Sequence, residues 1–126
     1  MMAISPRSVL IVEDEPALGL VLETAMEDAG YAVTLAGSGA DAIALLETDL
    51  PRFGAVVTDV RLDDGPDGWA VARRARELRP RMSVIYMSAY RAHEWVTKGV
   101  PGSLMLAKPF LPVQLVTAVG SGARLT

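Results

Sequence analysis

The chain contains no cysteine, which excludes disulfide bonds, thiolate metal sites and a cysteine nucleophile. It has no long apolar run: the longest stretches are about four or five residues, against the roughly 20 that a membrane-spanning helix needs. The first residues, MMAISPRS, lack a hydrophobic signal segment. The net charge is −3, whereas proteins that bind nucleic acid usually carry an excess of basic residues. We therefore expect a cytoplasmic protein that binds neither membranes nor nucleic acid.

What the chain does contain is enough apolar material for one core. Its 126 residues are 51% hydrophobic, which suits a single domain that buries roughly two-thirds of its unfolded surface. We expect one domain over residues 1–126, with its core at about 8–120 and no output domain after it. A monomer or a weak dimer is expected.

Strand and helix patterns alternate five times along the chain. Strand-like runs lie near residues 8–13, 32–36, 55–59, 83–88 and 103–107. Helical patterns follow them over 16–29, from Ser38, over 68–78, near 91–98 and from about 111–112 to 120. Because Gly99, Pro101 and Gly102 follow the fourth, that helix is expected to be short or irregular. The alternation predicts an α/β fold with a doubly wound, five-stranded parallel sheet and right-handed crossovers.

Polar residues follow four of the five predicted strands. They form four clusters: Glu13-Asp14, Asp59, Ser88-Ala89 and Lys108-Pro109. Because parallel strands point the same way, the residues past their carboxyl ends converge on one edge of the sheet, where open α/β sheets bind ligands. An X-Pro bond can be cis, which would hold the lysine stem in a fixed turn toward this edge.

The acidic members of these clusters suit a magnesium ion. Mg²⁺ takes oxygen ligands and usually only one or two protein carboxylates, which Glu13, Asp14 and Asp59 can supply. Each cluster also has an ordinary explanation: Glu13-Asp14 as the cap of the next helix, and Asp59 as a turn residue. A serine at a strand end and a solvated lysine are likewise common. The convergence of three acids at separate strand ends favours the metal site.

A carboxylate at this edge can also act as a nucleophile and accept a phosphoryl group. Ser88 offers a hydroxyl and Ala89 a backbone N–H to phosphoryl oxygens, and Lys108 offers a compact positive charge.

Four motifs make the chain resemble the receiver domain of two-component response regulators, of the stand-alone type. They are VLIVEDE, VVTDV, YMSA and LAKPF, in this order and at these intervals. The resemblance extends from Val9 to about Val119. It implies a (βα)5, flavodoxin-like fold with strand order 2-1-3-4-5.

The resemblance also implies a function and a set of site residues. Asp59 would accept a phosphoryl group from a phosphohistidine on a sensor histidine kinase or a histidine phosphotransfer protein. Asp14 would bind Mg²⁺ directly, Glu13 would act largely through water, and the backbone carbonyl of Arg61 would complete the protein ligands.

The remaining implied roles concern the phosphorylated form and its output. Ser88 and Lys108 would stabilise the phosphorylated form. The signal would pass by protein contact through the face of the fourth helix, fifth strand and fifth helix, or by a phosphorelay.

Two residues depart from the usual receiver pattern. Asp63 stands where receivers usually carry a proline, four residues after the acceptor, in a loop that looks one residue longer. Met105 stands where an aromatic residue is common, three residues before the lysine.

Two other functions compete with the switch. One is a Mg²⁺-dependent phosphohydrolase that forms an aspartyl phosphate, but such enzymes usually carry a second acid two residues after the nucleophile, where this chain has Arg61. The other is an unphosphorylated scaffold. The switch is favoured because the whole acid, hydroxyl and lysine set is intact, and it would catalyse only its own phosphorylation and dephosphorylation.

Residues outside these motifs are expected to have structural or surface roles. Trp69 is expected to pack on the core, and Trp95, with Val96, Val100 and the fifth helix, to form an exposed apolar patch. A group of arginines is expected to be the solvated face of the third helix: Arg73, Arg74, Arg76, Arg79 and Arg81.

Overall fold

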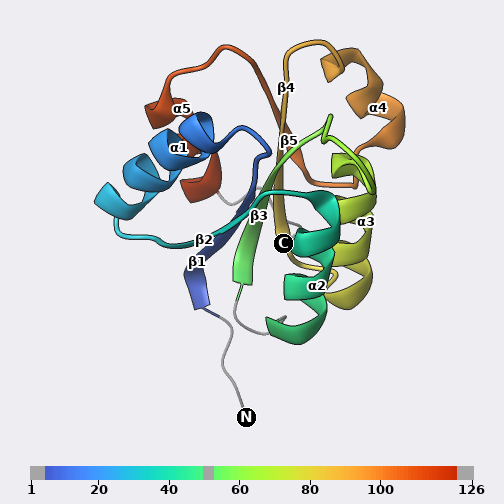
Figure 1. Ribbon diagram of the computed structural model, residues 1–126, viewed down its shortest axis with the longest axis horizontal. Helices are drawn as coiled ribbons and strands as arrows, with labels where there is room; N and C mark the ends of the chain where they lie inside the picture. Colours follow the sequence, from blue (N-terminus) through green and yellow to red (C-terminus); the bar gives the residue numbers. More distant parts are fainter. Residues whose placement is uncertain (1–4, 50–52, 122–126) are drawn as a thin grey trace.

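A computed structural model describes residues 5–49 and 53–121 and contains one five-stranded parallel sheet of order β2-β1-β3-β4-β5 (Figure 1). The strands are β1 (Ser5–Val12), β2 (Ala32–Ala36), β3 (Phe53–Asp59), β4 (Ser83–Ser88) and β5 (Leu104–Ala107). The helices are α1 (Pro16–Asp28), α2 (Gly39–Asp49), α3 (Gly68–Leu78), α4 (Trp95–Lys98) and α5 (Pro112–Gly120), with a 3₁₀ turn, η2 (Ala92–Glu94), before α4. The predicted fold class and strand order are confirmed.

The helices cover the sheet from both sides. Figure 1 shows α1 and α5 on one face and α2, α3 and α4 on the other. Every residue of β3 and β4 is buried, because these central strands have helices on both faces. The alternating side chains of each strand therefore feed two separate apolar clusters, one on each side of the sheet.

Three helices begin at residues that favour a helix start. Pro16 is the first residue of α1, where the missing N–H costs no helical hydrogen bond. Ser38 Oγ accepts from the Asp41 N–H at 3.1 Å before α2, and Asp67 Oδ1 accepts from the Ala70 N–H at 2.9 Å before α3. The fourth helix is short, as the sequence indicates: α4 has only four residues.

Two of these arginines are structural, Arg76 in α3 and Arg79 directly after it, and the expectation of a solvated face is wrong for them. Arg76 donates to the carbonyl oxygens of Met82, at 2.7 Å, and Pro101, at 2.5 Å. Arg79 donates to the carbonyl oxygen of Phe53. These guanidinium groups donate hydrogen bonds to backbone carbonyl oxygens outside α3, which would otherwise lose hydrogen bonds on burial.

The two tryptophans differ in role. Trp69 is buried, as expected, and its ring centroid lies 4.7 Å from that of Tyr86. The expected patch around Trp95 is only partly present: Val96 is 85% exposed, but Val100 is buried and Trp95 packs against the core.

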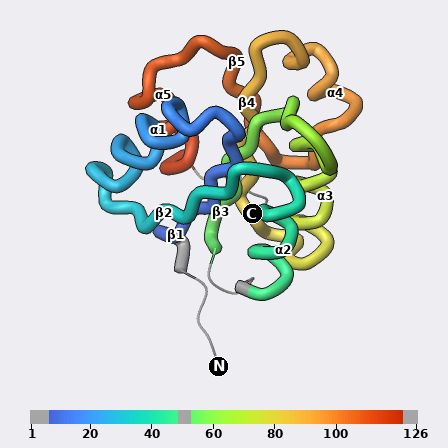
Figure 2. The backbone as a smooth tube through the Cα atoms, in the orientation of Figure 1, coloured from blue at the N-terminus to red at the C-terminus, as the bar shows by residue number. Residues whose placement is uncertain are grey.

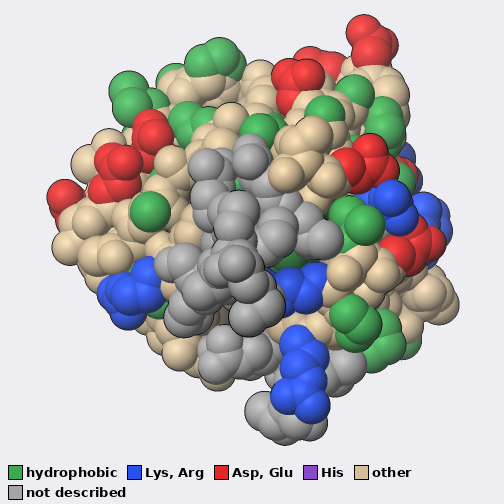
Figure 3. All heavy atoms as spheres, turned by 90° about the horizontal axis from the view of Figure 1, so that it is seen from below, with side chains coloured by type: hydrophobic (Ala, Val, Ile, Leu, Met, Phe, Trp, Pro, Cys, Tyr) green, Lys and Arg blue, Asp and Glu red, His purple; other side chains and the backbone are tan. Residues whose placement is uncertain are grey.

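The loops that follow β1, β3, β4 and β5 gather at one edge of the sheet (Figure 2). Backbone hydrogen bonds join them there: the Val60 N–H donates to Met87 O at 2.9 Å, and the Lys108 N–H to Ser88 O at 2.8 Å. The opposite end of the molecule carries both acidic and basic side chains around its rim (Figure 3). No helix among the described residues has the length and apolarity to cross a bilayer.

Gly68 sets the distance between α3 and the end of β3. A Cβ atom built on Gly68 would lie 1.9 Å from the Asp59 carbonyl oxygen and 2.8 Å from Val60 Cα. Only glycine therefore allows the start of α3 to approach the backbone of Asp59 this closely.

We expect Gly68→Ala to lower the free energy of unfolding by about 2–3 kcal/mol, because the backbone must move to admit the methyl group. Urea unfolding followed by circular dichroism measures the change. Gly37→Ala is the control, because nothing lies within 4 Å of its Cβ position. Equal stabilities for the two variants would contradict the close approach.

Candidate functional site

Three carboxylates meet at the edge where the loops gather. Glu13 and Asp14 directly follow β1, and Asp59 ends β3. One oxygen of each lies within 4.8 Å of the others. Glu13 and Asp59 are buried, whereas Asp14 is half-buried. The sequence-predicted acidic cluster is thus present as a group.

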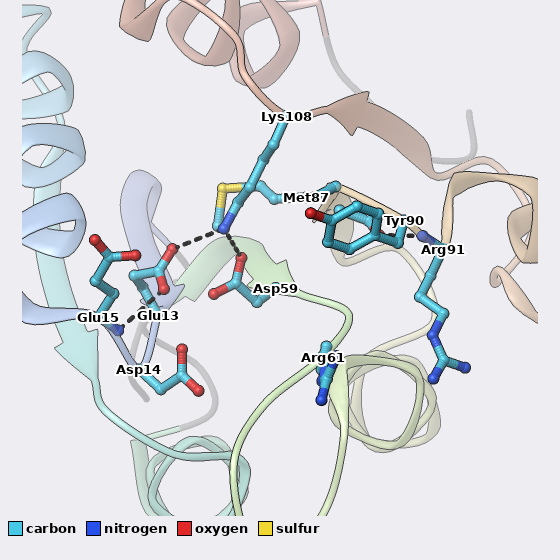
Figure 4. A pocket seen from close by; sticks show the side chains of 11 residues that line it. Glu13, Asp14, Glu15, Asp59, Arg61, Met87, Tyr90, Arg91 and Lys108 are labelled. Atoms are coloured by element: carbon cyan, nitrogen blue, oxygen red, sulfur yellow. Dashed lines mark hydrogen bonds and ion pairs between the residues drawn. The ribbon is translucent and has the colours of Figure 1, made fainter.

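Lys108 reaches this cluster from the loop after β5. Its Nζ lies 2.6 Å from Asp59 Oδ1 and 3.3 Å from Glu13 Oε1 (Figure 4). The Lys108–Pro109 peptide bond is cis. The lysine therefore neutralises charge on two buried carboxylates that come from different strands.

The hydroxyl cluster lies beside the acids but makes a different contact. Ser88 is buried at the end of β4, and its Oγ accepts from the Arg91 N–H at 2.7 Å. Ala89 and Arg61 are exposed and line the same pocket as Asp59, which has a volume of about 180 Å³. The pocket is lined by Glu13, Asp14, Glu15, Asp59, Arg61, Met87, Ser88, Ala89, Tyr90, Arg91 and Lys108.

Two backbone contacts that sequence reasoning missed hold the acids in place. The Asp63 N–H donates to Asp14 Oδ2 at 3.0 Å, and the Glu15 N–H donates to Glu13 Oε2 at 3.1 Å. The first contact has a signal in the sequence, because a proline at position 63 would have no N–H to donate. The unusual Asp63 thus ties the β3–α3 loop to Asp14.

Burial and the crowding of charge perturb the acids and the lysine. Burial, together with the hydrogen bond and the charge of Glu13, raises the pKa of Asp59 to about 8, although Lys108 opposes the shift. Burial alone would lower the pKa of Lys108, but the hydrogen bond and charge of Asp59 and the charge of Glu13 raise it. The metal-free site is therefore short of positive charge.

The site residues fit a divalent cation. One oxygen of each of the three carboxylates lies within 4.8 Å of the other two, so these side chains can reach one shared cation. Carboxylate oxygens are the ligands that Mg²⁺ prefers, and a cation here would relieve the charge repulsion that Lys108 only partly offsets.

Comparison with known proteins assigns the chain to a family. A family model described as the response regulator receiver domain matches residues 9–120. The chain belongs to this family. Its acidic cluster fits the Mg²⁺ and aspartyl phosphate site of receiver domains, which act in two-component systems as signalling switches rather than as classical enzymes.

Relatives at the sequence level differ greatly in length. An uncharacterised 14.6 kDa protein of Leptolyngbya boryana is 31% identical over 124 residues, which cover 94% of this chain and 92% of that protein. The sensor kinase CckA of Brucella abortus is 33% identical over 115 residues, which cover 89% of this chain and 12% of the kinase. The chain spans 56% of the probable transcriptional regulatory protein TcrX of Mycobacterium tuberculosis, at 33% identity.

Solved structures agree with this assignment. A response regulator receiver protein from Sinorhizobium medicae is 44% identical, with a TM-score of 0.88 over 96% of this chain and 94% of that chain. The receiver domain of the sensor histidine kinase PA1611 from Pseudomonas aeruginosa is 28% identical, with a TM-score of 0.78 over 92% and 96% of the two chains. That structure has a magnesium ion coordinated in its active-site cleft.

The raised pKa of Asp59 predicts how stability depends on pH. Between its ordinary pKa of 3.8 and about 8, the folded metal-free receiver keeps a proton on Asp59 that the unfolded chain has lost. Because the folded state binds more protons in this window, stability falls as pH rises. We expect a fall of about 1–3 kcal/mol relative to Asp59→Asn, measured by urea unfolding in EDTA from about pH 4 to pH 8.

Asp64→Asn is the control for that experiment, because it removes an exposed acid from the β3–α3 loop. Its stability should follow that of the parent across the pH range. Parallel curves for the parent and Asp59→Asn would refute the raised pKa.

Proposed function

We propose that this receiver is a phosphorylation-dependent switch in which Asp59 accepts a phosphoryl group from a phosphohistidine partner. The observation that carries the proposal is the contact of Lys108 Nζ with Asp59 Oδ1, at 2.6 Å, inside a pocket that is also lined by Glu13 and Asp14. Glu13, Asp14, Asp59 and the backbone carbonyl of Arg61 would hold Mg²⁺, which would supply positive charge to phosphoryl oxygens.

The chemistry assigned to the site is a single group transfer. An Asp59 carboxylate oxygen forms a bond to phosphorus while the phosphorus–nitrogen bond of phosphohistidine breaks, and the imidazole leaves with the electron pair of that bond. Lys108 neutralises charge on the acyl phosphate, and the Ser88 hydroxyl and the Ala89 N–H donate to its oxygens. Charge-assisted bonds of this kind hold the phosphoryl group without a dedicated substrate pocket.

A groove beside the acceptor pocket gives the partner a place to bind. Its volume is about 470 Å³, and it shares Ala89, Tyr90 and Lys108 with the pocket that holds Asp59. The rest of its lining is mostly apolar: Leu18, Val21, Leu22, Pro109, Phe110 and Pro112. Because the groove borders the pocket that a phosphohistidine must enter to reach Asp59, we propose that the groove binds the domain that carries the phosphohistidine.

The output surface is proposed on the face of α4, β5 and α5. Two apolar side chains are exposed there, Val96 at 85% and Val113 at 61%. Exposed apolar residues of this kind suit a transient contact with a downstream protein.

Incubation with acetyl phosphate and Mg²⁺ should add one phosphoryl group to the receiver, because Asp59 is the buried carboxylate that lies nearer to Lys108, at 2.6 Å against 3.3 Å for Glu13. Intact-mass spectrometry detects the added group. Asp59→Asn should abolish it, and Asp64→Asn should retain it. Undiminished labelling of Asp59→Asn would overturn the acceptor assignment. Many turnovers of the phosphodonor by the parent would favour the phosphohydrolase instead.

Val21→Glu should separate partner docking from chemistry, since Val21 lines the groove and is 50% exposed. In the assay, purified histidine kinases are autophosphorylated one at a time with labelled ATP and mixed with the receiver. We expect phosphotransfer to the variant to be at least about fivefold slower, because the glutamate places a charge in the apolar contact. Labelling by acetyl phosphate should not change. Val96→Glu, outside the groove, is the control; equal effects of both variants on transfer would contradict the docking site.

A further inference from the structure

The β3–α3 loop, residues 60–67, is held in place by backbone contacts near both of its ends. The Gly68 N–H donates to Val60 O at 2.8 Å, which joins the two ends of the loop. A Cβ atom on Gly39 would collide with the carbonyl group of Pro66, so the loop lies directly against the start of α2. The backbone of the loop is therefore fixed in relation to both β3 and α2.

This fixed loop presents one backbone N–H to the acidic cluster. The Asp63 N–H donates to Asp14 Oδ2 at 3.0 Å, and among the described residues no other group donates a hydrogen bond to the Asp14 side chain. Lys108 lies within ion-pair distance of Asp59 and Glu13, and no such pair joins it to Asp14 in the described part of the chain. The position of the Asp14 carboxylate therefore depends on this single N–H.

Each carboxylate of the cluster has one oxygen engaged by a neighbouring group. Glu13 Oε2 accepts from the backbone N–H two residues further along the chain, at 3.1 Å, and Asp59 Oδ1 lies 2.6 Å from Lys108 Nζ. Asp14 is engaged through Oδ2, which leaves Oδ1 for a cation. None of the three acids can offer both oxygens to one cation without losing a contact that the fold provides.

A carboxylate that offers only one oxygen distinguishes between divalent cations. Mg²⁺ demands near-octahedral geometry, keeps several waters and is bound through one or two protein carboxylates. Ca²⁺ takes more oxygens, about six to eight, and often binds a carboxylate through both of its oxygens. Asp14 with Oδ2 held by an N–H suits the first ion and denies the second a ligand atom.

We propose that the Asp63 N–H is a positioning group that sets the affinity of the cation site and its preference for Mg²⁺ over Ca²⁺. The proposal rests on the Mg²⁺ site put forward above. The donor belongs to the backbone, so any residue except proline can supply it at this position. The proline that receivers usually carry four residues after the acceptor has no N–H and could not make this contact. The Asp63 side chain is exposed, and its charge takes no part in the bond.

Titrations of the full chain with MgCl₂ and CaCl₂, followed by NMR of the backbone amides, measure both affinities. Asp63→Pro should raise the Kd for Mg²⁺ about three- to tenfold and the Kd for Ca²⁺ less, because Asp14 regains its second oxygen. Asp63→Ala keeps the N–H and should stay within about twofold of the parent for both ions. Parent-like binding by Asp63→Pro, or an equal loss in Asp63→Ala, would show that the N–H does not position Asp14.

Gly65→Ala tests the same point without removing the N–H. Gly65 has a φ of +89°, which alanine adopts only with strain, and nothing lies within 4 Å of its Cβ position. The substitution therefore displaces the loop backbone rather than creating a clash. We expect Mg²⁺ affinity to fall at least about threefold, and Gly37→Ala, whose Cβ position is also open, to have no effect. Should Asp63→Pro fail to fold, unchanged Mg²⁺ affinity in Gly65→Ala refutes the proposal.

Amide hydrogen exchange in EDTA tests the contact with no cation present. Asp14→Ala should speed exchange of the Asp63 N–H about three- to tenfold and leave that of the Gly68 N–H, which is bonded to Val60 O, unchanged. Equal exchange of the Asp63 N–H in the parent and the variant would contradict the contact.

The titrations also separate this proposal from the metal site on which it rests. If the parent and Asp14→Ala bind Mg²⁺ equally well, the proposed Mg²⁺ site fails and the role of Asp63 falls with it. If Asp14→Ala loses Mg²⁺ but Asp63→Pro and Gly65→Ala do not, the Mg²⁺ site stands and only the positioning role of Asp63 is removed.

Discussion

The contact between Lys108 Nζ and Asp59 Oδ1 is the one on which the site depends. Two carboxylates, Glu13 and Asp59, are buried within reach of one another, and like charges at such a distance cannot both ionise without opposite charge nearby. Lys108 supplies one such charge at 2.6 Å from Asp59 and 3.3 Å from Glu13. The remaining negative charge attracts a divalent cation, and the cation and Lys108 together would provide the positive charge that a phosphoryl group needs. The crowded carboxylates thus account both for the electrostatic cost of the metal-free state and for the chemistry of the site.

The sheet makes this crowding possible. The acids follow β1 and β3, and the lysine follows β5, so their backbones are fixed by strand pairing rather than by loop structure. The loops are then tied locally: the Asp63 N–H holds Asp14, and Gly68 lets α3 begin against the backbone of Asp59. A rigid scaffold of this kind can keep like charges together because their separation would require strands to part.

Strand β4 connects the site to the surface. Its side chains alternate between the two faces of the sheet, and those of Tyr86 and Ser88 leave the face covered by α3 and α4. Ser88 lies in the acceptor pocket, and the Tyr86 hydroxyl accepts from the Val100 N–H, which follows α4 in the chain.

Much of the fold and of the site was readable in the sequence. The buried strands β3 and β4 appear in the sequence as apolar runs, and the helices begin next to Pro16, Ser38 and Asp67. Polar residues at the ends of the strands mark the pocket. These features can be predicted because the periodicity of strands and helices depends on residue type and because parallel strands end at the same edge of the sheet.

Other features were decided only in three dimensions. These are the contact of Asp63 with Asp14, the bonds of Arg76 and Arg79 to backbone carbonyl oxygens, and the bonds that join the chain on either side of α4 to two side chains of β4. Each joins a backbone group to a partner chosen by the packing of elements. A sequence pattern shows which groups need a hydrogen bond, but tertiary structure alone determines which partner comes within reach.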